Sequence, residues 1–215
     1  MTALDHVVVA AASLDEGVRW CEATLGVTPS AGGAHPLMGT HNRVLDISSE
    51  RFTRCYLEII AIDPAAPAPT ATRRWFDLDD PAMQRRLREQ GPRLVHWAVR
   101  SDRIDELAPQ VDSGTVRAAS RQTPHGELRW RITIRDDGRR GAGGALPTLI
   151  EWGDMHPCDR LPASGVALRT IEVAGLGAAF DTLRLREAGV TPSLDTAMPL
   201  AVELDAPRGR VRLTP

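Results

Sequence analysis

The sequence predicts an α+β protein in which two paired βαβββ modules form cupped mixed sheets, followed by a truncated third βαββ module. Three observations lead to this prediction. A strand pattern with a histidine two residues after a leucine occurs twice, at residues 4–9 and 94–99. Each copy is followed by a helix pattern and then by three strand patterns. The pentapeptide Gly-Val-Thr-Pro-Ser also occurs twice, at 26–30 and 189–193.

Residues 1–62 are predicted as the first βαβββ module. Ser13 and Glu16 form a capping-box pattern at the start of a helix that runs to about Leu25, and Gly26 suits the end of that helix. Three strand patterns follow the helix, at 27–30, 41–47 and 54–62.

Residues 63–91 are predicted as a linker with a short helix, and residues 92–158 as the second module. The linker is rich in Pro and Ala, and its helix covers 80–90. In the second module, Ser101 suits the start of a helix that ends near Val111. Its three later strand patterns lie at 115–120, 127–135 and 146–152.

Residues 159–215 are predicted as the truncated third module. A strand pattern at 166–173 precedes a helix pattern at 176–188. Two short strand patterns then complete the chain, at 200–204 and 210–213.

The composition excludes several classes of protein. Twenty-six basic and 28 acidic residues give a net charge of −2, which excludes a strongly basic nucleic-acid binder. All basic residues are Arg, so a Schiff-base lysine and a Walker phosphate loop are excluded. The start of the chain lacks a basic signal region, and no segment has the ~18 apolar residues of a membrane span, so we expect a cytoplasmic protein. The three cysteines predict no disulfide framework because they are widely spaced: Cys21, Cys55 and Cys158.

Each full module carries one histidine and one glutamate at comparable places. Glu58 follows His6 by 52 residues, and Glu151 follows His96 by 55 residues. A single strand histidine is more often a core residue, and a single strand glutamate more often faces solvent. Their duplication favours a shared metal or ligand site, since two imidazoles and two carboxylates suit a divalent ion such as Zn, Ni, Co, Mn or Fe.

These patterns resemble the glyoxalase-like proteins of the vicinal oxygen chelate superfamily, which pair βαβββ modules. The resemblance covers about residues 3 to 158. It implies a metal held by His6, Glu58, His96 and Glu151, from the first and last strands of the two modules. The third module has Thr170 in the place of a ligand histidine, so we expect it to be structural and to cover a sheet edge. Four short motifs carry the resemblance: His35-Pro-Leu-Met-Gly-Thr-His-Asn42, Tyr56-Leu57-Glu58, Arg129-Trp130-Arg131, and Leu149-Ile-Glu-Trp152 with His156-Pro157 beyond it.

Two further pairs of side chains are candidates for substrate binding. His41 and Asn42 are expected to point into the cleft, or else to form the polar start of a strand after a turn. Arg129 and Arg131 share one strand face and would bind a carboxylate or phosphate if that face lines the cleft. A solvated strand face is the alternative interpretation.

The tryptophans beside the ligand candidates are expected on the other faces of their strands. Trp97 follows His96, and Trp152 follows Glu151. Because side chains alternate along a strand, both rings are predicted to pack against helices.

The resemblance implies a metal-dependent lyase or isomerase that acts on a small oxygenated substrate, a 2-oxo compound or similar, chelated to the ion. The ion would stabilise an enolate, and Glu58 or Glu151 would move a proton. A non-catalytic small-molecule-binding or sequestering protein and a ring-cleaving dioxygenase are the alternatives. The expected partner is a small molecule, without nucleic acid or membrane. One chain suffices to build the site, and an uncovered sheet edge leaves a homodimer open.

Overall fold

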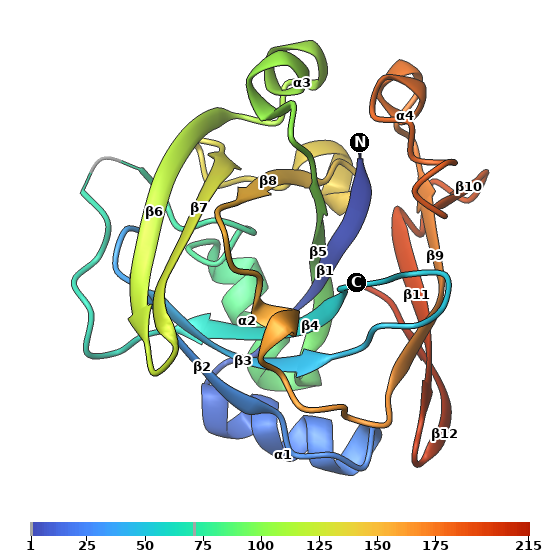
Figure 1. Ribbon diagram of the computed structural model, residues 1–215. Helices are drawn as coiled ribbons and strands as arrows, with labels where there is room; N and C mark the ends of the chain where they lie inside the picture. The colour runs from blue at the N-terminus through green and yellow to red at the C-terminus, as the bar shows by residue number, and fades with distance from the viewer. Residues whose placement is uncertain (1, 71) are drawn as a thin grey trace.

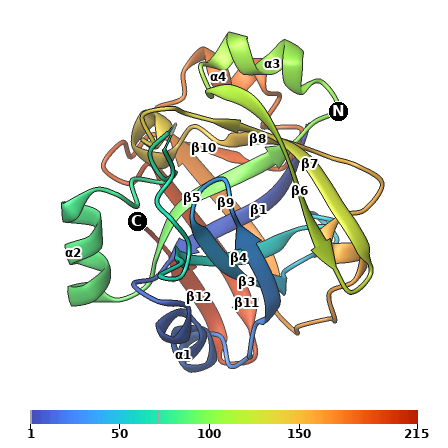
Figure 2. The same ribbon diagram turned by 90° about the vertical axis from the view of Figure 1, so that its left-hand side faces the viewer.

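Two βαβββ modules join edge to edge in one strongly curved, nearly closed sheet (Figures 1 and 2). The computed structural model describes residues 2–70 and 72–215; Met1, in the predicted first module, and Ala71, in the predicted linker, lie outside the described residues. The strand order of the eight-stranded sheet is β2-β3-β4-β1-β5-β8-β7-β6. The predicted α+β class and the paired modules are therefore confirmed.

The elements of each module follow the predicted order. Module one consists of β1 (Ala3–Ala10), α1 (Leu14–Thr24), β2 (Ser30–His35), β3 (Thr40–Asp46) and β4 (Tyr56–Ile62). Helix α2 (Pro81–Gln90) lies between the modules. Module two consists of β5 (Arg93–Arg100), α3 (Ile104–Val111), β6 (Thr115–Thr123), β7 (Gly126–Ile134) and β8 (Thr148–Trp152). In each module the first strand runs parallel to the last, and β1 and β5 pair antiparallel at the centre of the sheet.

Local sequence signals set most of the helix ends. The Ser13 hydroxyl accepts the backbone N–H of Glu16, which confirms the predicted cap of α1. Asp80 caps α2 in the same way. Helix α3 begins later than predicted, because the hydroxyl of Ser101 accepts the N–H of Arg103 in a turn that precedes the helix.

The third unit has the same order of elements but a different pairing. It consists of β9 (Ala167–Ala174), α4 (Ala178–Thr182), β10 (Thr191–Ser193), β11 (Leu200–Ala206) and β12 (Gly209–Leu213), and its strand order is β10-β9-β11-β12. Its first strand pairs with β10 and β11, not with its last strand. The predicted helix over 176–188 is correct only for its first part. Gly26 and Gly189 have φ values of 82° and 86°, so the repeated pentapeptide starts with the same left-handed residue.

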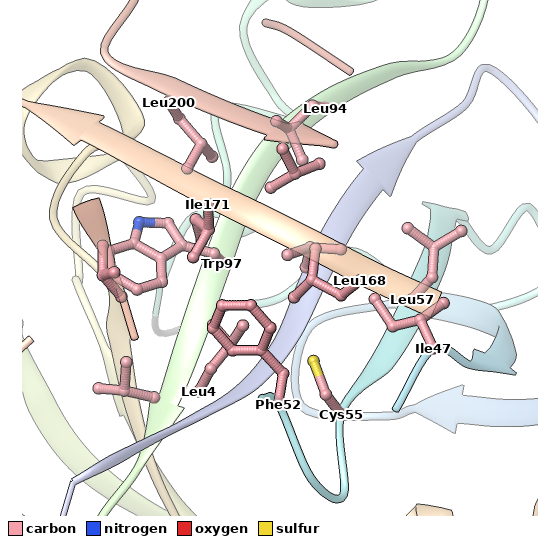
Figure 3. Close-up of a cluster of buried hydrophobic side chains, with 14 of the residues drawn as sticks. Leu4, Ile47, Phe52, Cys55, Leu57, Leu94, Trp97, Leu168, Ile171 and Leu200 are labelled. Atoms are coloured by element: carbon pink, nitrogen blue, oxygen red, sulfur yellow. The ribbon is translucent and has the colours of Figure 1, made fainter. Parts of the chain in front are cut away.

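The third unit covers the outer face of the large sheet rather than an edge, so that expectation was wrong. Outward-facing side chains of β1, β4 and β5 pack against β9 and β11 in one apolar cluster (Figure 3). Trp97 lies fully buried in this cluster, on the strand face opposite His96, as predicted. The cluster also includes residues of α1 and α3, and these helices lie on either side of the second sheet (Figure 1).

The inner face of the sheet is concave and is partly filled by the segment before α2. Phe76, Leu78 and residues of α2 pack on inward-facing side chains of β1, β4 and β5. Inward-facing residues of β7 and β8 form a separate apolar cluster. A polar region remains between these two clusters, and the candidate site lies there. No helix among residues 2–70 and 72–215 is long and apolar enough to cross a membrane.

We expect the second sheet to stabilise the whole fold. Ile171→Ala removes a fully buried side chain at the junction of the two sheets and should lower the free energy of unfolding by about 2–5 kcal/mol. Glu172→Ala, on the exposed side of the same strand, is the control and should cost less than about 1 kcal/mol. Urea unfolding measures both. Equal stability of Ile171→Ala and the parent would contradict this account of the core.

Candidate functional site

A small cavity lies inside the curved sheet, between module one and strands β7 and β8. Its volume is about 30 Å³, which is room for one or two water molecules. We call it the inner cavity. Its walls are largely aromatic and aliphatic, and its polar lining residues are His6, His35, Asn42, Tyr56, Glu58 and Arg121.

His6 is held by a buried carboxylate next to it in the chain. The pairing of β1 with β5 shifts register between Leu4 and His6, and this bulge brings Asp5 to the side of His6 despite strand alternation. Asp5 is 0% exposed, and its Oδ1 lies 2.6 Å from Nδ1 of His6. Its Oδ2 accepts the indole N–H of Trp152 at 2.9 Å and lies 3.0 Å from Nε2 of His156.

The hydrogen bonds assign the tautomer of His6. Burial by itself raises the pKa of Asp5, but hydrogen bonds from His156 and His6 outweigh it and hold that pKa well below its usual range. Asp5 is therefore a carboxylate that accepts a hydrogen bond from the Nδ1–H group of His6. The lone pair on Nε2 of His6 is then free, and Nε2 lies 3.9 Å from Oε2 of Glu58.

Glu58 is positioned by an amide. It is 5% exposed, and its Oε1 accepts an N–H of Asn42 at 2.6 Å. The second N–H of Asn42 points to Nε2 of His35 at 3.3 Å, so that nitrogen acts as the acceptor. Burial lowers the pKa of His35 to about 4, which keeps its ring neutral near pH 7. The Oε2 atom of Glu58 faces His6.

His96 is arranged differently from His6. The backbone N–H of Thr148 donates to its Nε2 at 3.1 Å, so the lone pair of that nitrogen is already used. The proton is then on Nδ1, which is buried and has no hydrogen-bond partner among the described residues. Burial lowers the pKa of His96 to about 3. The ring stacks on Phe76, with 4.6 Å between centroids, and lines a second small cavity.

Glu151 lies on the outer face of β8. Its carboxylate accepts an N–H of Arg131 at 2.8 Å, and both residues line an open groove away from the inner cavity. Strand pairing explains this position. Glu58 lies opposite Val8 in β1, and the corresponding position in module two, opposite Ala98 in β5, is Thr148.

The spacing of residues in the sequence already distinguishes Thr148 from Glu151 as the counterpart of Glu58. Thr148 follows His96 by 52 residues, as Glu58 follows His6, whereas Glu151 is three residues further along. A shift by an odd number of residues places a side chain on the opposite face of a strand. The structure therefore does not bring His6, Glu58, His96 and Glu151 together.

The strand faces of the other candidates also follow this alternation. Trp152 faces the inner cavity, so the expectation that it packs against a helix was wrong. Asn42 lines the cavity, while its neighbour His41 does not. The structure does not bring Arg129 and Arg131 to the cavity either: they pair with acidic residues on the outer face, where Arg129 bonds Glu127 and Arg131 bonds Glu151 and Asp105.

Two aromatic residues separate His96 from the inner cavity. Trp75 and Phe76, which we call the aromatic plug, line both the inner cavity and the second cavity around His96. Phe76 and Asp77 have φ values of 61° and 60°, an unfavourable conformation for residues with side chains. A partly buried ion pair holds the segment, with Nε of Arg140 2.7 Å from Oδ2 of Asp77.

The predicted metal set does not fit one ion in this arrangement. Glu151 is on the other strand face, and the lone pair of Nε2 in His96 accepts a backbone N–H. No group of three or more His, Cys, Asp or Glu within residues 2–70 and 72–215 is arranged to hold a metal. Of the four predicted ligands, His6 and Glu58 remain neighbours, with 3.9 Å between Nε2 and Oε2.

Several residues of the inner cavity were not selected from the sequence. Asp5 and Arg121 have no strong local motif, and the role of Asp5 depends on a bulge that alternation does not predict. Tyr56 precedes Glu58 by two residues, which is a usable signal for a shared strand face. Burial and the nearby Asp5 and Glu58 raise the pKa of Tyr56 well above 10, so its phenol stays protonated.

Comparisons with known proteins agree with this fold. A family profile described as a glyoxalase-like domain matches residues 4–188. The chain belongs to the glyoxalase-like domain family, within the vicinal oxygen chelate superfamily. No curated protein matches this glyoxalase-like chain.

Solved structures similar to this glyoxalase-like protein have low sequence identity to it. A hypothetical protein from Staphylococcus aureus has 13% identity and a TM-score of 0.52, over 100% of this chain and 88% of that chain. Methylmalonyl-CoA epimerase from Mycobacterium tuberculosis has 19% identity and a TM-score of 0.39, over 70% and 86% of the two chains. A hypothetical protein from Bacillus halodurans has 12% identity and a TM-score of 0.40, over 72% and 96%.

The buried neutral histidines should make the protein sensitive to acid. Their folded pKa values, about 3 for His96 and about 4 for His35, lie below the ordinary value of 6.5. The unfolded chain therefore binds more protons below pH 6.5, and the free energy of unfolding should fall as the pH decreases from 6.5 towards 4. Each pKa unit of difference corresponds to roughly 1.4 kcal/mol.

The contribution of His96 is measured by urea unfolding at a series of pH values. His96→Gln should reduce the loss of stability over this range, because Gln does not titrate and can still accept the N–H of Thr148. His125→Gln, at an exposed turn, is the control and should keep the parent slope. Identical slopes for His96→Gln and the parent would show that His96 is not buried in its neutral form.

Proposed function

We propose that this glyoxalase-like protein is an isomerase or lyase that transfers a proton on a small oxygenated substrate, a 2-oxo compound or similar, bound at the inner cavity. One observation supports the proposal most strongly. The carboxylate of Glu58 is buried 3.9 Å from an imidazole nitrogen of His6 whose lone pair is free. Two proton acceptors on facing groups are suited to general acid–base chemistry.

The two groups have different parts in the proposed reaction. Glu58 takes the proton from the carbon next to a carbonyl; the C–H bond breaks, its electron pair forms the C=C bond of an enolate, and the carbonyl oxygen becomes negative. Nε2 of His6 accepts the proton of a neighbouring hydroxyl, and Asp5 stabilises the resulting imidazolium. In an isomerisation both protons return to the substrate at exchanged positions, so that atoms and charge balance.

Neighbouring groups support these parts. Asn42 donates to Oε1 of Glu58 and directs Oε2 towards the cavity. Tyr56 stacks on the ring of His6 at 4.6 Å between centroids. Its protonated phenol is a suitable donor to an enolate oxygen.

The resemblance implies a metal-dependent reaction, but the positions of the four predicted ligands do not allow all of them to bind one ion. Of the four predicted ligands, His6 and Glu58 line the inner cavity, and the full set of four does not fit one ion. No step of the proposed reaction therefore passes through an ion. A metal retained by the protein should be lost in His6→Ala and kept in Glu151→Ala, as measured by elemental mass spectrometry.

Substrate entry requires that the inner cavity enlarge. A volume of about 30 Å³ does not hold a three-carbon compound. The aromatic plug lines this cavity and has an unfavourable backbone conformation at Phe76. Its withdrawal would join the inner cavity to the second cavity around His96, and we propose this as the route of entry.

The central test is hydrogen exchange in deuterium oxide, followed by NMR. The parent should accelerate deuterium uptake at the carbon next to the carbonyl of at least one of pyruvate, 2-oxobutanoate, dihydroxyacetone and methylglyoxal. Glu58→Gln keeps the amide contact but removes the base, so the rate should fall by about 10²–10⁴-fold. Glu151→Gln, on the outer face, is the matched control and should keep the parent rate.

Two results would contradict the proposal. One is exchange that survives in Glu58→Gln. The other is the absence of exchange on every compound by the parent, which would favour the binding protein described next.

A non-catalytic small-molecule binder is the second candidate. The four predicted metal ligands are not brought together, and this favours the binder, because a protein that only binds a small molecule does not need a metal site. The cavity walls, with Tyr56, Trp130 and Trp152, suit stacking on a planar compound. Thermal stabilisation by a compound that undergoes no exchange would support this candidate.

A further inference from the structure

Arg121 reaches across the opening of the curved sheet into the inner cavity. It belongs to β6, and β6 and β2 are the two end strands of the large sheet. Arg121 lies opposite Leu128 in β7, which places its side chain on the inner face. The guanidinium lies over Gly33 of β2, where a Cβ atom would be 2.8 Å from Nη1.

The guanidinium of Arg121 has few partners in this position. Within residues 2–70 and 72–215, its one hydrogen bond joins Nη1 to Oδ1 of Asn42 at 3.4 Å, which is long. Its Nε is buried and has no acceptor, and none of the acidic residues in the described part of the chain forms an ion pair with it. Other arginines of the same hairpin are paired, such as Arg129 with Glu127 and Arg117 with Asp136.

Arg121 is half-buried, and a half-buried cation without a charged partner carries a cost in free energy. An anion that contacts the N–H groups of Nε and the adjoining Nη would offset this cost. Those N–H groups form the planar fork that holds a carboxylate through two parallel hydrogen bonds. A carboxylate is smaller than a phosphate ester, so its binding requires less enlargement of the inner cavity.

The side-chain amide of Asn42 lies between Arg121 and Glu58, and it therefore separates an anion on Arg121 from the proposed base. Asn42 contacts Arg121 through Oδ1 and Glu58 through Nδ2. A carboxylate on Arg121 is therefore separated from Glu58 by one side chain, that of Asn42.

We propose that Arg121 determines substrate specificity by binding the carboxylate of the substrate, so that the substrate class is a short 2-oxo or 2-hydroxy acid. The reaction of this acid rests on the function proposed above, but its recognition does not. The esters and amides of such acids are neutral, so they lack the negative charge that would pair with Arg121.

A purely structural role for Arg121 makes a different prediction. If the side chain only joins β2 to β6, its loss lowers stability without changing the preference between an acid and its amide. The preference itself is therefore the decisive measurement.

The test compares pyruvate with pyruvamide by saturation-transfer NMR titration of the full chain. The parent should bind pyruvate about tenfold or more tightly than pyruvamide, in keeping with a charge-assisted pair. Arg121→Gln should reduce this ratio to near one. Arg129→Gln removes the same charge from the outer face of the adjacent strand, and it should keep the parent ratio.

A second variant moves the guanidinium without removing its charge. Gly33→Ala places a methyl group 2.8 Å from the present position of Nη1 of Arg121, which is too close for both to stay. Gly33 does not have a positive φ that would strain alanine. The side chain of Arg121 must shift, so the preference for pyruvate should decrease. Gly153→Ala, where the added Cβ meets only ordinary contacts at 3.4 Å or more, is the matched control.

The outcomes separate this inference from the proposed function. Equal binding of acid and amide by the parent, or an unchanged ratio in Arg121→Gln, would overturn the role of Arg121. Glu58→Gln should keep the preference for the acid, because the base is not needed for recognition. A preserved preference together with absent exchange would leave the role of Arg121 standing and overturn the catalytic proposal alone.

Discussion

The candidate site depends on one buried carboxylate. Asp5 is fully enclosed and bonds to three groups, His6, Trp152 and His156. These groups come from the first strand, from the last strand of the second module, and from the turn beyond it at η2 (Pro157–Asp159), which His156 caps. A charge in the protein interior is tolerated only when it is well bonded, so Asp5 constrains all three together. Because Asp5 accepts a hydrogen bond from Nδ1 of His6, the proton of the His6 ring lies on Nδ1. The lone pair on Nε2, which faces Glu58, is then unused.

The comparison of His6 with His96 shows why duplicated residues need not have duplicated roles. Both lie on the first strand of a module and on the inner face. Asp5 accepts a hydrogen bond from the Nδ1–H group of His6, whereas the backbone N–H of Thr148 donates to Nε2 of His96. Only His6 then presents an unused basic nitrogen to the cavity. The two modules share a fold, and module one supplies the polar centre while module two supplies mostly aromatic and aliphatic walls.

The sequence predicted the fold better than the site, for a physical reason. Strand and helix patterns, the cap at Ser13 and the repeated pentapeptide are local, and the elements lie close to their predicted positions. Face assignments depend on register, where an error of three residues moved Glu151 to the wrong side of β8. The bulge at Asp5 and the folding of the linker over the inner face depend on contacts between distant parts of the chain. Sequence periodicity does not carry that information.

The tautomer of His6 tests this account most directly. Nitrogen-15 NMR of histidine-labelled protein, with signals assigned through His6→Gln and His96→Gln, distinguishes a protonated from an unprotonated ring nitrogen. The account predicts that His6 carries its proton on Nδ1 and has an unprotonated Nε2 near pH 7. It also predicts that Asp5→Asn perturbs the signals of His6 more than those of His96. A His6 ring protonated on Nε2, with Nδ1 unprotonated, would contradict the account.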